Sequence, residues 1–223
     1  MFSKRVNIFM GHYGSGKTFI SVNFAEALKA LGKSVAVYDL DIVNPYFRTV
    51  DARTRLLDKG IELIASSFAQ SNVDLPSINP SSYQLVDDKS KFAVIDVGGD
   101  DRGALALGRF SEKVVAENDY RAHFVLNKFR PETNTLEGAL EIRDEIERSA
   151  KIKFTAIVNN ANLGEITTEQ TVLDGYKFAK EFSSLTGLPL VFTSVREDII
   201  TEKIKKEINN ILPVKPIKYG NWL

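Results

Sequence analysis

Cysteine is absent from the 223 residues, and histidine, methionine and tryptophan are scarce. Without cysteine the chain has no disulfide, no thiolate zinc site, no cysteine-ligated iron–sulfur cluster and no cysteine nucleophile. The two histidines, His12 and His123, are too few for a histidine-rich metal cage. These absences exclude thiol chemistry and argue against a histidine-based metal site.

An excess of charge and a long hydrophobic run are also absent. The 29 basic and 29 acidic side chains balance, which removes the electrostatic basis for non-specific nucleic-acid binding. The apolar run Val6–Met10 is too short for a signal peptide, and no stretch approaches the about 18 apolar residues of a membrane span. We therefore expect a cytoplasmic protein, and this composition carries no specific signal for a nucleic-acid or membrane partner.

Short apolar runs recur along the chain, and 43% of the residues are hydrophobic. The runs are nearly continuous in hydrophobicity, as is typical of strands buried on both faces of a parallel sheet. They lie at Val6–Met10, Ser34–Tyr38, Ile61–Ala65, Phe92–Val97, His123–Asn127, Phe154–Asn159 and Leu190–Ser194. The length suits one domain, residues 1–223, with a sheet of about seven strands.

Helical periodicity fills the intervals between these runs. Apolar residues at helical spacing run from Ile20 to Leu31 and from Leu136 to Ile146, and a third helix is expected over Thr168–Thr186. The irregular segment 66–90 is expected to be a loop with a short helix near Ser77–Val86. Alternating strands and helices predict an α/β fold, an open and mostly parallel twisted sheet with helices on both faces.

A glycine-rich motif directly follows the first expected strand. Residues 11–18, Gly-His-Tyr-Gly-Ser-Gly-Lys-Thr, fit G-x-x-x-x-G-K-[ST] and open a helix, which is the context of a phosphate-binding loop (P-loop). Its backbone N–H groups would converge on phosphate oxygens, Lys17 would reach the β- and γ-phosphates, and Thr18 would ligate Mg²⁺. The expected nucleotide contacts are Gly11, Tyr13, Gly14, Ser15, Gly16, Lys17, Thr18 and Phe19. The motif predicts binding of a nucleoside triphosphate.

Carboxylates follow two other expected strands. Asp39 and Asp41 stand at the end of the second strand, and Asp96 ends the fourth, just before Gly98 and Gly99. Because the carboxyl ends of parallel strands share one crevice, these acids are expected near the phosphates. Asp96 suits a carboxylate that holds Mg²⁺ through water, and the glycines would let a backbone N–H approach the γ-phosphate.

Together these motifs resemble the MinD/ParA-type ATPases, the group that includes the nitrogenase iron protein, and the resemblance covers Val6–Asp198. It implies ATP and Mg²⁺ as cofactors, with Asp41 positioning the hydrolytic water and Thr18, Asp41 and Asp96 around the metal. It implies nucleotide-sensing switches at 41–51 and 96–108. It also implies a homodimer and an unknown protein partner.

The P-loop departs from that family in one respect. The family's loop reads Lys-Gly-Gly-x-Gly-Lys-[ST], and its first lysine crosses a dimer interface to the partner's phosphates. Here His12 and Tyr13 stand at the positions of that lysine and the following glycine. Hydrolysis that depends on dimerisation is therefore not carried over, and Arg48 and Arg102 are candidates to replace the missing lysine.

Two segments bear on the choice of base. Residues 127–130, Asn-Lys-Phe-Arg, carry arginine where the guanine-specific Asn-Lys-x-Asp motif has its acid, which argues against guanine at this position. In the resembling family an asparagine after the next strand contacts adenine; Asn160 matches it best, with Asn159 as the alternative. Val195 and Arg196, after the last strand, are expected to cover the adenine face.

Three functions remain open at this point. The first is a Mg²⁺-dependent ATPase that acts as a nucleotide-driven switch. The second is an ATP-dependent transferase or ligase of the dethiobiotin-synthetase or cobyrinate-amidating type, with an acceptor site formed by loop 66–90. The third is a nucleotide sensor that does not hydrolyse its ligand. At the C-terminus, residues 201–210 predict a helix that closes the sheet or, as in MinD, binds a membrane.

Overall fold

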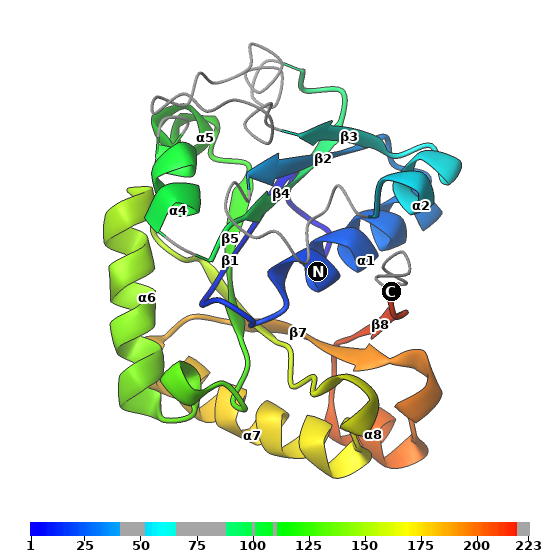
Figure 1. The fold of residues 1–223 in the computed structure, drawn as a ribbon, viewed down its shortest axis with the longest axis vertical. Helices are drawn as coiled ribbons and strands as arrows, with labels where there is room; N and C mark the ends of the chain where they lie inside the picture. The colour runs from blue at the N-terminus through cyan, green and yellow to red at the C-terminus, as the bar shows by residue number, and fades with distance from the viewer. Residues whose placement is uncertain (41–51, 66–87, 100, 109–110, 218–223) are drawn as a thin grey trace, which may run out of the picture.

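A single parallel sheet forms the centre of the computed structural model, which describes residues 1–40, 52–65, 88–99, 101–108 and 111–217 (Figure 1). Within those residues the sheet has eight strands in the order β3-β2-β4-β1-β5-β6-β7-β8. The strands are β1 Val6–Met10, β2 Val35–Leu40, β3 Glu62–Ala65, β4 Phe92–Val97, β5 Tyr120–Leu126, β6 Ala156–Asn159, β7 Leu190–Arg196 and β8 Ile211–Val214. The predicted α/β fold is confirmed.

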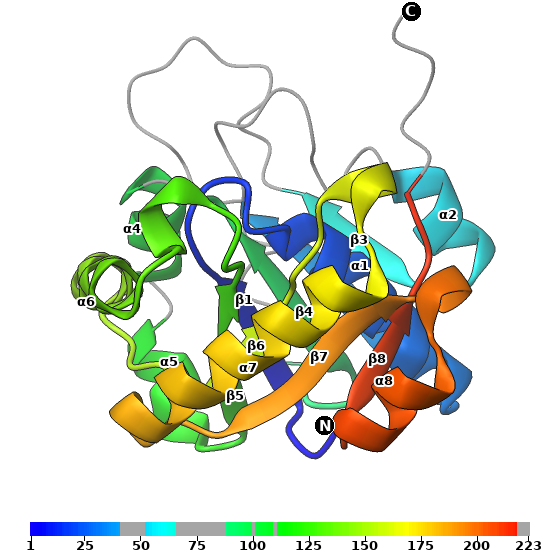
Figure 2. The same cartoon turned by 90° about the horizontal axis from the view of Figure 1, so that it is seen from below.

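Helices cover both faces of the sheet. Helices α1 and α2 pack on one face, and α4 to α7 pack on the other, with α8 beside α7 (Figures 1 and 2). The helices are α1 Lys17–Ala30, α2 Arg53–Asp58, α4 Asp101–Gly108, α5 Ser111–Glu117, α6 Leu136–Ala150, α7 Glu169–Thr186 and α8 Glu202–Glu207. Short 3₁₀ turns are η4 Pro131–Thr133, η5 Gly164–Ile166 and η6 Glu197–Ile199.

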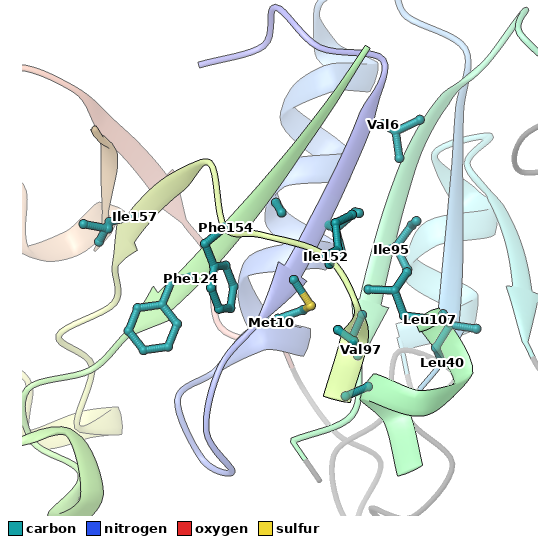
Figure 3. Packing of buried hydrophobic residues seen from close by; sticks show 14 of the residues in the cluster. Val6, Met10, Leu40, Ile95, Val97, Leu107, Phe124, Ile152, Phe154 and Ile157 are labelled. Carbon is teal, nitrogen blue, oxygen red and sulfur yellow. The ribbon is translucent and has the colours of Figure 1, made fainter. Parts of the chain in front are cut away.

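Each central strand contributes side chains to two hydrophobic cores, because successive residues of a strand point to opposite faces. In β1, Ile8 belongs to the core under α4 to α7, while Phe9 belongs to the core under α1. Figure 3 shows part of the first core, where Met10 and Val97 lie close to Leu107 of α4. Because the central strands are parallel, their carboxyl ends and the loops that follow lie at the same edge of the sheet.

The C-terminal segment differs from the prediction. Helix α8 ends at Glu207, and Ile211–Val214 forms strand β8, parallel to β7 at the edge of the sheet. Pro213 has no backbone N–H to donate, which an edge strand tolerates because one of its sides has no neighbouring strand. None of the helices in the described ranges is both long and apolar enough to cross a bilayer.

His123 of β5 lies in the core beneath α1. Its ring stacks on Phe9 at 4.6 Å between centroids, and its Nε2 lies 3.2 Å from Oδ1 of Asn7. Burial, followed by the charges of Arg121 and of the chain's amino terminus, holds the pKa of His123 well below the ordinary 6.5. The folded protein therefore keeps this histidine neutral.

Acidification is expected to destabilise the fold through His123. Below about pH 6.5 the unfolded chain binds a proton that the folded state refuses, so the free energy of unfolding falls as pH falls. Between pH 6.5 and 5.5 this group should remove about 1 kcal/mol. Urea unfolding of the wild type and of His123→Phe at both pH values measures the effect. Parallel losses in the two proteins would contradict it.

Candidate functional site

The P-loop connects β1 to α1 and depends on two glycines with positive φ. Gly14 has a φ of 75° and Gly16 a φ of 90°, a region that residues with a Cβ rarely adopt. The backbone N–H of Ser15 donates to the carbonyl of His12 at 3.1 Å, which closes the turn. The sequence motif and its predicted strand-to-helix context are therefore both present in the fold.

The N-terminus of α1 has no side-chain cap. Threonine side chains cap α6, α7 and α8, at Thr135, Thr168 and Thr201, whereas Gly16 stands at the cap position of α1. The first turn of α1 also lacks an acidic residue. The start of α1 thus offers the positive end of its dipole to an external anion.

Lys17 lies between the P-loop and the turn that follows β4. Its side chain is largely buried, and its Nζ donates to the carbonyl of His12 at 3.1 Å. A Cβ added at Gly99 would stand 2.8 Å from Nζ of Lys17 and 2.9 Å from the backbone N of Tyr13. Only a glycine therefore fits at position 99, and the P-loop and the turn after β4 are in direct contact.

Two aspartates lie side by side under the first turns of α1. Asp39 of β2 and Asp96 of β4 are register partners, and both are fully buried. The hydroxyl of Ser21, one turn into α1, donates to Oδ1 of Asp96 at 3.4 Å. The role of Asp96 at the metal stays a prediction, and Asp41 lies outside the described residues.

Asn160, directly after β6, supports the P-loop from below. Its Nδ2 donates to the carbonyl of Ser15 at 2.6 Å, and its Oδ1 accepts from the hydroxyl of Ser194 in β7 at 2.6 Å. A Cβ at Gly16 would overlap the same Nδ2. The contact of Asn160 with adenine stays a prediction, whereas its bond to the P-loop is a feature of the structure.

The other residues predicted near the base have different surroundings. Val195 is buried in a cluster with Val172 of α7 and Ile204 of α8, and its contact with the adenine face stays a prediction. Arg196 donates to the carbonyl of Gly164 at 2.7 Å. It also pairs with Asp198, and this hydrogen bond lowers the pKa of the Asp198 carboxyl.

Exposure differs among the remaining predicted contacts. Tyr13 is 57% exposed, Thr18 is nearly buried, and Phe19 is half-buried against the core beneath α1. Ser15 has a buried Oγ without a hydrogen-bond partner among the described residues. A phosphate-binding loop with a buried, unpaired hydroxyl and an uncapped helix start fits a bound polyphosphate. For Arg102 the structure describes the backbone in α4, and Arg48 lies outside the described residues.

Sequence reasoning missed three residues that the fold brings to the P-loop. Ser21 bonds Asp96, Ser194 bonds Asn160, and Arg130 lies against Gly14. The two members of each pair are 75, 34 and 116 positions apart in the sequence, respectively. No local spacing in the sequence therefore reveals these contacts. The strand order is the information that was missing.

A cavity of about 220 Å³ adjoins the P-loop on the side of α6. Gly11 and His12 of the loop and Gly98 after β4 form one wall, and Ile142 and Ile146 of α6 form another. Its volume suits a small molecule beside the position that the motif assigns to the terminal phosphate.

Comparison with protein families and solved structures agrees with this geometry. The model of the family described as CbiA, the CobQ/CobB/MinD/ParA nucleotide binding domain, matches residues 8–172. Cell division protein FtsY from Thermotoga maritima is similar in structure, with a TM-score of 0.59 and 19% identity over 87% of this chain and 62% of that one. No curated protein sequence matches.

Two further structures of FtsY show the same likeness. FtsY from Mycoplasma mycoides has a TM-score of 0.56 and 15% identity over 86% of this chain and 60% of that one. The signal recognition particle receptor FtsY from Elizabethkingia anophelis, solved in complex with GDP, has a TM-score of 0.56 and 18% identity over 88% and 58%. The chain thus spans less than two thirds of these structures, and the likeness concerns the fold.

Proposed function

Because the chain belongs to the CobQ/CobB/MinD/ParA nucleotide-binding domain family, we propose that it is a Mg²⁺-dependent ATPase that acts as a nucleotide-driven switch. Family membership supplies nucleotide binding by a P-loop NTPase fold. The choice of ATP, the need for Mg²⁺ and hydrolysis are parts of the proposal, as are a homodimer and a protein partner that recognises one nucleotide state.

The contact of Gly99 with Lys17 and Tyr13 carries the proposal of a switch. Lys17, which would reach the terminal phosphate, lies close to the turn that follows Asp96. A Cβ at Gly99 of this turn would stand only 2.8 Å from Nζ of Lys17. Helix α4 begins at Asp101, two residues after this contact. A terminal phosphate beside Lys17 would press on Gly99, and its loss would release the turn, so the position of α4 would report the state of the nucleotide.

The residues present divide the chemistry among them. Lys17 and the positive end of the α1 dipole would offset the negative charge that develops on the phosphates. Thr18 and Asp96 would hold Mg²⁺, which would supply positive charge at the phosphates, and the hydroxyl of Ser21 donates to the carboxylate of Asp96. Asp41 would orient the attacking water.

The residues at the end of β6 favour adenine over guanine as the bound base. The segment Asn159–Asn162, at the end of β6, offers amide side chains and no carboxylate. A carboxylate is the acceptor that guanine N1–H and N2–H require. Because one of the similar FtsY structures holds GDP, the binding of ATP and of GTP should be measured side by side.

Phosphate release with ATP or GTP, with and without Mg²⁺, tests the proposal. Turnover is expected with ATP and Mg²⁺, and Asp41→Ala should lower it by about 10²- to 10⁴-fold. Asp58→Ala, at the exposed end of α2, is the matched control. Preference for GTP would overturn the choice of base, tight ATP binding without turnover would indicate a sensor, and absence of binding would overturn the proposal.

A second candidate function is favoured by the cavity beside the P-loop. A small acceptor bound between Gly98 and Ile146 would lie where a phosphoryl group could be transferred to it in place of water. The same assay separates this transferase or ligase from the switch. Turnover that appears only when a small acceptor is added, and that disappears in Ile146→Trp, would favour it.

A further inference from the structure

The guanidinium of Arg130 lies against the P-loop. A Cβ at Gly14 would stand 3.1 Å from Cζ of Arg130, 3.2 Å from Nε and 3.4 Å from Nη1. The Nε is buried and has no hydrogen-bond partner among the described residues. The arginines that form ion pairs within the described ranges are Arg5, Arg55, Arg143 and Arg196. Arg130 thus brings a cation to the loop without a carboxylate from that part of the chain.

The backbone around Arg130 is fixed by hydrogen bonds. Its N–H donates to the carbonyl of Asn127 at 3.2 Å, and its carbonyl accepts from the N–H of Thr133 at 3.1 Å. The hydroxyl of Thr133 donates to the carbonyl of Asn127 at 2.7 Å. The resulting 127–133 turn follows β5, which pairs with β1, so it runs beside the P-loop. The position of Arg130 is therefore set by the sheet.

The 127–133 turn contacts the P-loop at a second point. Oε2 of Glu132 lies 3.5 Å from Nδ1 of His12, which also lies 3.0 Å from the carbonyl of Tyr13. His12 stands where the resembling family has its extra lysine, and its ring is directed to this turn. In the described part of the chain, Arg130 therefore lies against the P-loop as a second cationic side chain, in addition to Lys17.

The Nε–H of the half-buried Arg130 side chain is buried without a hydrogen-bond partner among the described residues, which costs free energy because a charged donor has lost its bond to water. The guanidinium is a planar fork that matches the oxygens of a phosphate, and here it lies against Gly14 of the glycine-rich loop. From this juxtaposition we infer that Arg130 is a nucleotide-binding residue, which donates from Nε and a terminal nitrogen to a phosphate oxygen of the ligand in its own P-loop. The inference rests on the proposed nucleotide site.

Titration calorimetry with ATP and with inorganic tripolyphosphate tests this assignment. Arg130→Gln should weaken the binding of both ligands by about 10- to 100-fold, the range of a lost hydrogen bond to a charged group. Arg130→Lys, which keeps the charge but loses the fork, should fall between wild type and Arg130→Gln. Arg148→Gln is the matched control, because this arginine lies on the exposed side of α6 and donates to the carbonyl of Asp144.

Thermal unfolding without ligand gives a second readout. A packing role for Arg130 predicts a lower Tm with unchanged affinity, whereas the inferred role predicts an unchanged Tm without ligand and a smaller rise on adding ATP. Equal affinities of wild type and Arg130→Gln for ATP would overturn the inference. So would a loss for ATP with none for tripolyphosphate, since that places Arg130 on the base. Failure of wild type to bind ATP would instead overturn the proposed function.

Discussion

Replacing Lys17 by alanine is expected to weaken ATP binding by about 30- to 150-fold and to abolish measurable turnover. Its ammonium is held between the carbonyl of His12 and the Cα of Gly99, largely out of water. Hydrogen bonds to a charged group in such a place contribute about 2–3 kcal/mol, which corresponds to this range of affinity. The loss of rate adds to it because charge develops on the transferred group.

Calorimetry and phosphate release on Lys17→Ala measure both effects. Lys29→Ala is the control, because Lys29 stands in the last turn of the same helix, away from the P-loop. An unchanged affinity of Lys17→Ala for ATP would contradict the proposal that the P-loop binds the phosphates.

Buried parallel strands were predictable because their sequence pattern is local. The runs Val6–Met10 and Phe92–Val97 match β1 and β4 to the residue, since strands covered on both faces are continuously apolar. Helix α7 ends at Thr186, as predicted, and the following Gly187 has a φ of 71° that favours glycine. Continuous apolar runs and helix stop signals were thus sufficient to predict most of the strands and helices.

Strand β8 was missed because it is short and contains Pro213. Ile204, Ile208 and Ile211 continue a helical spacing, but the backbone leaves the helix at Ile208, whose φ and ψ are −114° and 112°. The chain then pairs with β7, where Leu212 and Val214 are buried. A tertiary pairing partner decided this segment, and nothing within it specifies that partner.

The site was predictable in its motifs and not in its supports. Residues of the P-loop and Asp96 follow directly from strand ends, which the sequence marks. The segment ending in Arg130 was interpreted only for the choice of base, because its place beside the P-loop depends on β5 lying next to β1. The water-positioning role of Asp41 stays a prediction, because that residue lies outside the described part of the chain.

Asn160→Ala is expected to cost about 2–5 kcal/mol of unfolding free energy and to weaken ATP binding. The change removes two short hydrogen bonds and leaves the carbonyl of Ser15 and the hydroxyl of Ser194 buried without this partner. Each unsatisfied buried group costs about 1–3 kcal/mol. Affinity should fall as well, since Ser15 is part of the loop that would wrap the phosphates. Urea unfolding and ATP titration measure the two effects.

Asn159→Ala provides a matched control from the neighbouring position. Asn159 is equally buried, but its amide makes one long bond of 3.4 Å to Thr193, and its Oδ1 has no partner among the described residues. Its removal creates a similar void without releasing the P-loop. We expect a smaller loss of stability and an unchanged affinity for ATP. A loss of affinity as large as that of Asn160→Ala would show that any void under the sheet disturbs the loop.

Gly16→Ala completes the argument, because its added methyl group meets the Asn160 amide. At a φ of 90° any Cβ costs about 1–2 kcal/mol, and the overlap with Nδ2 adds to this in the wild-type background only. In the Asn160→Ala background the overlap is gone, so the second substitution should cost only the backbone part. The two losses of unfolding free energy should therefore be less than additive. Strict additivity would mean that Asn160 and Gly16 do not share this contact, and the support of the P-loop would have to come from elsewhere.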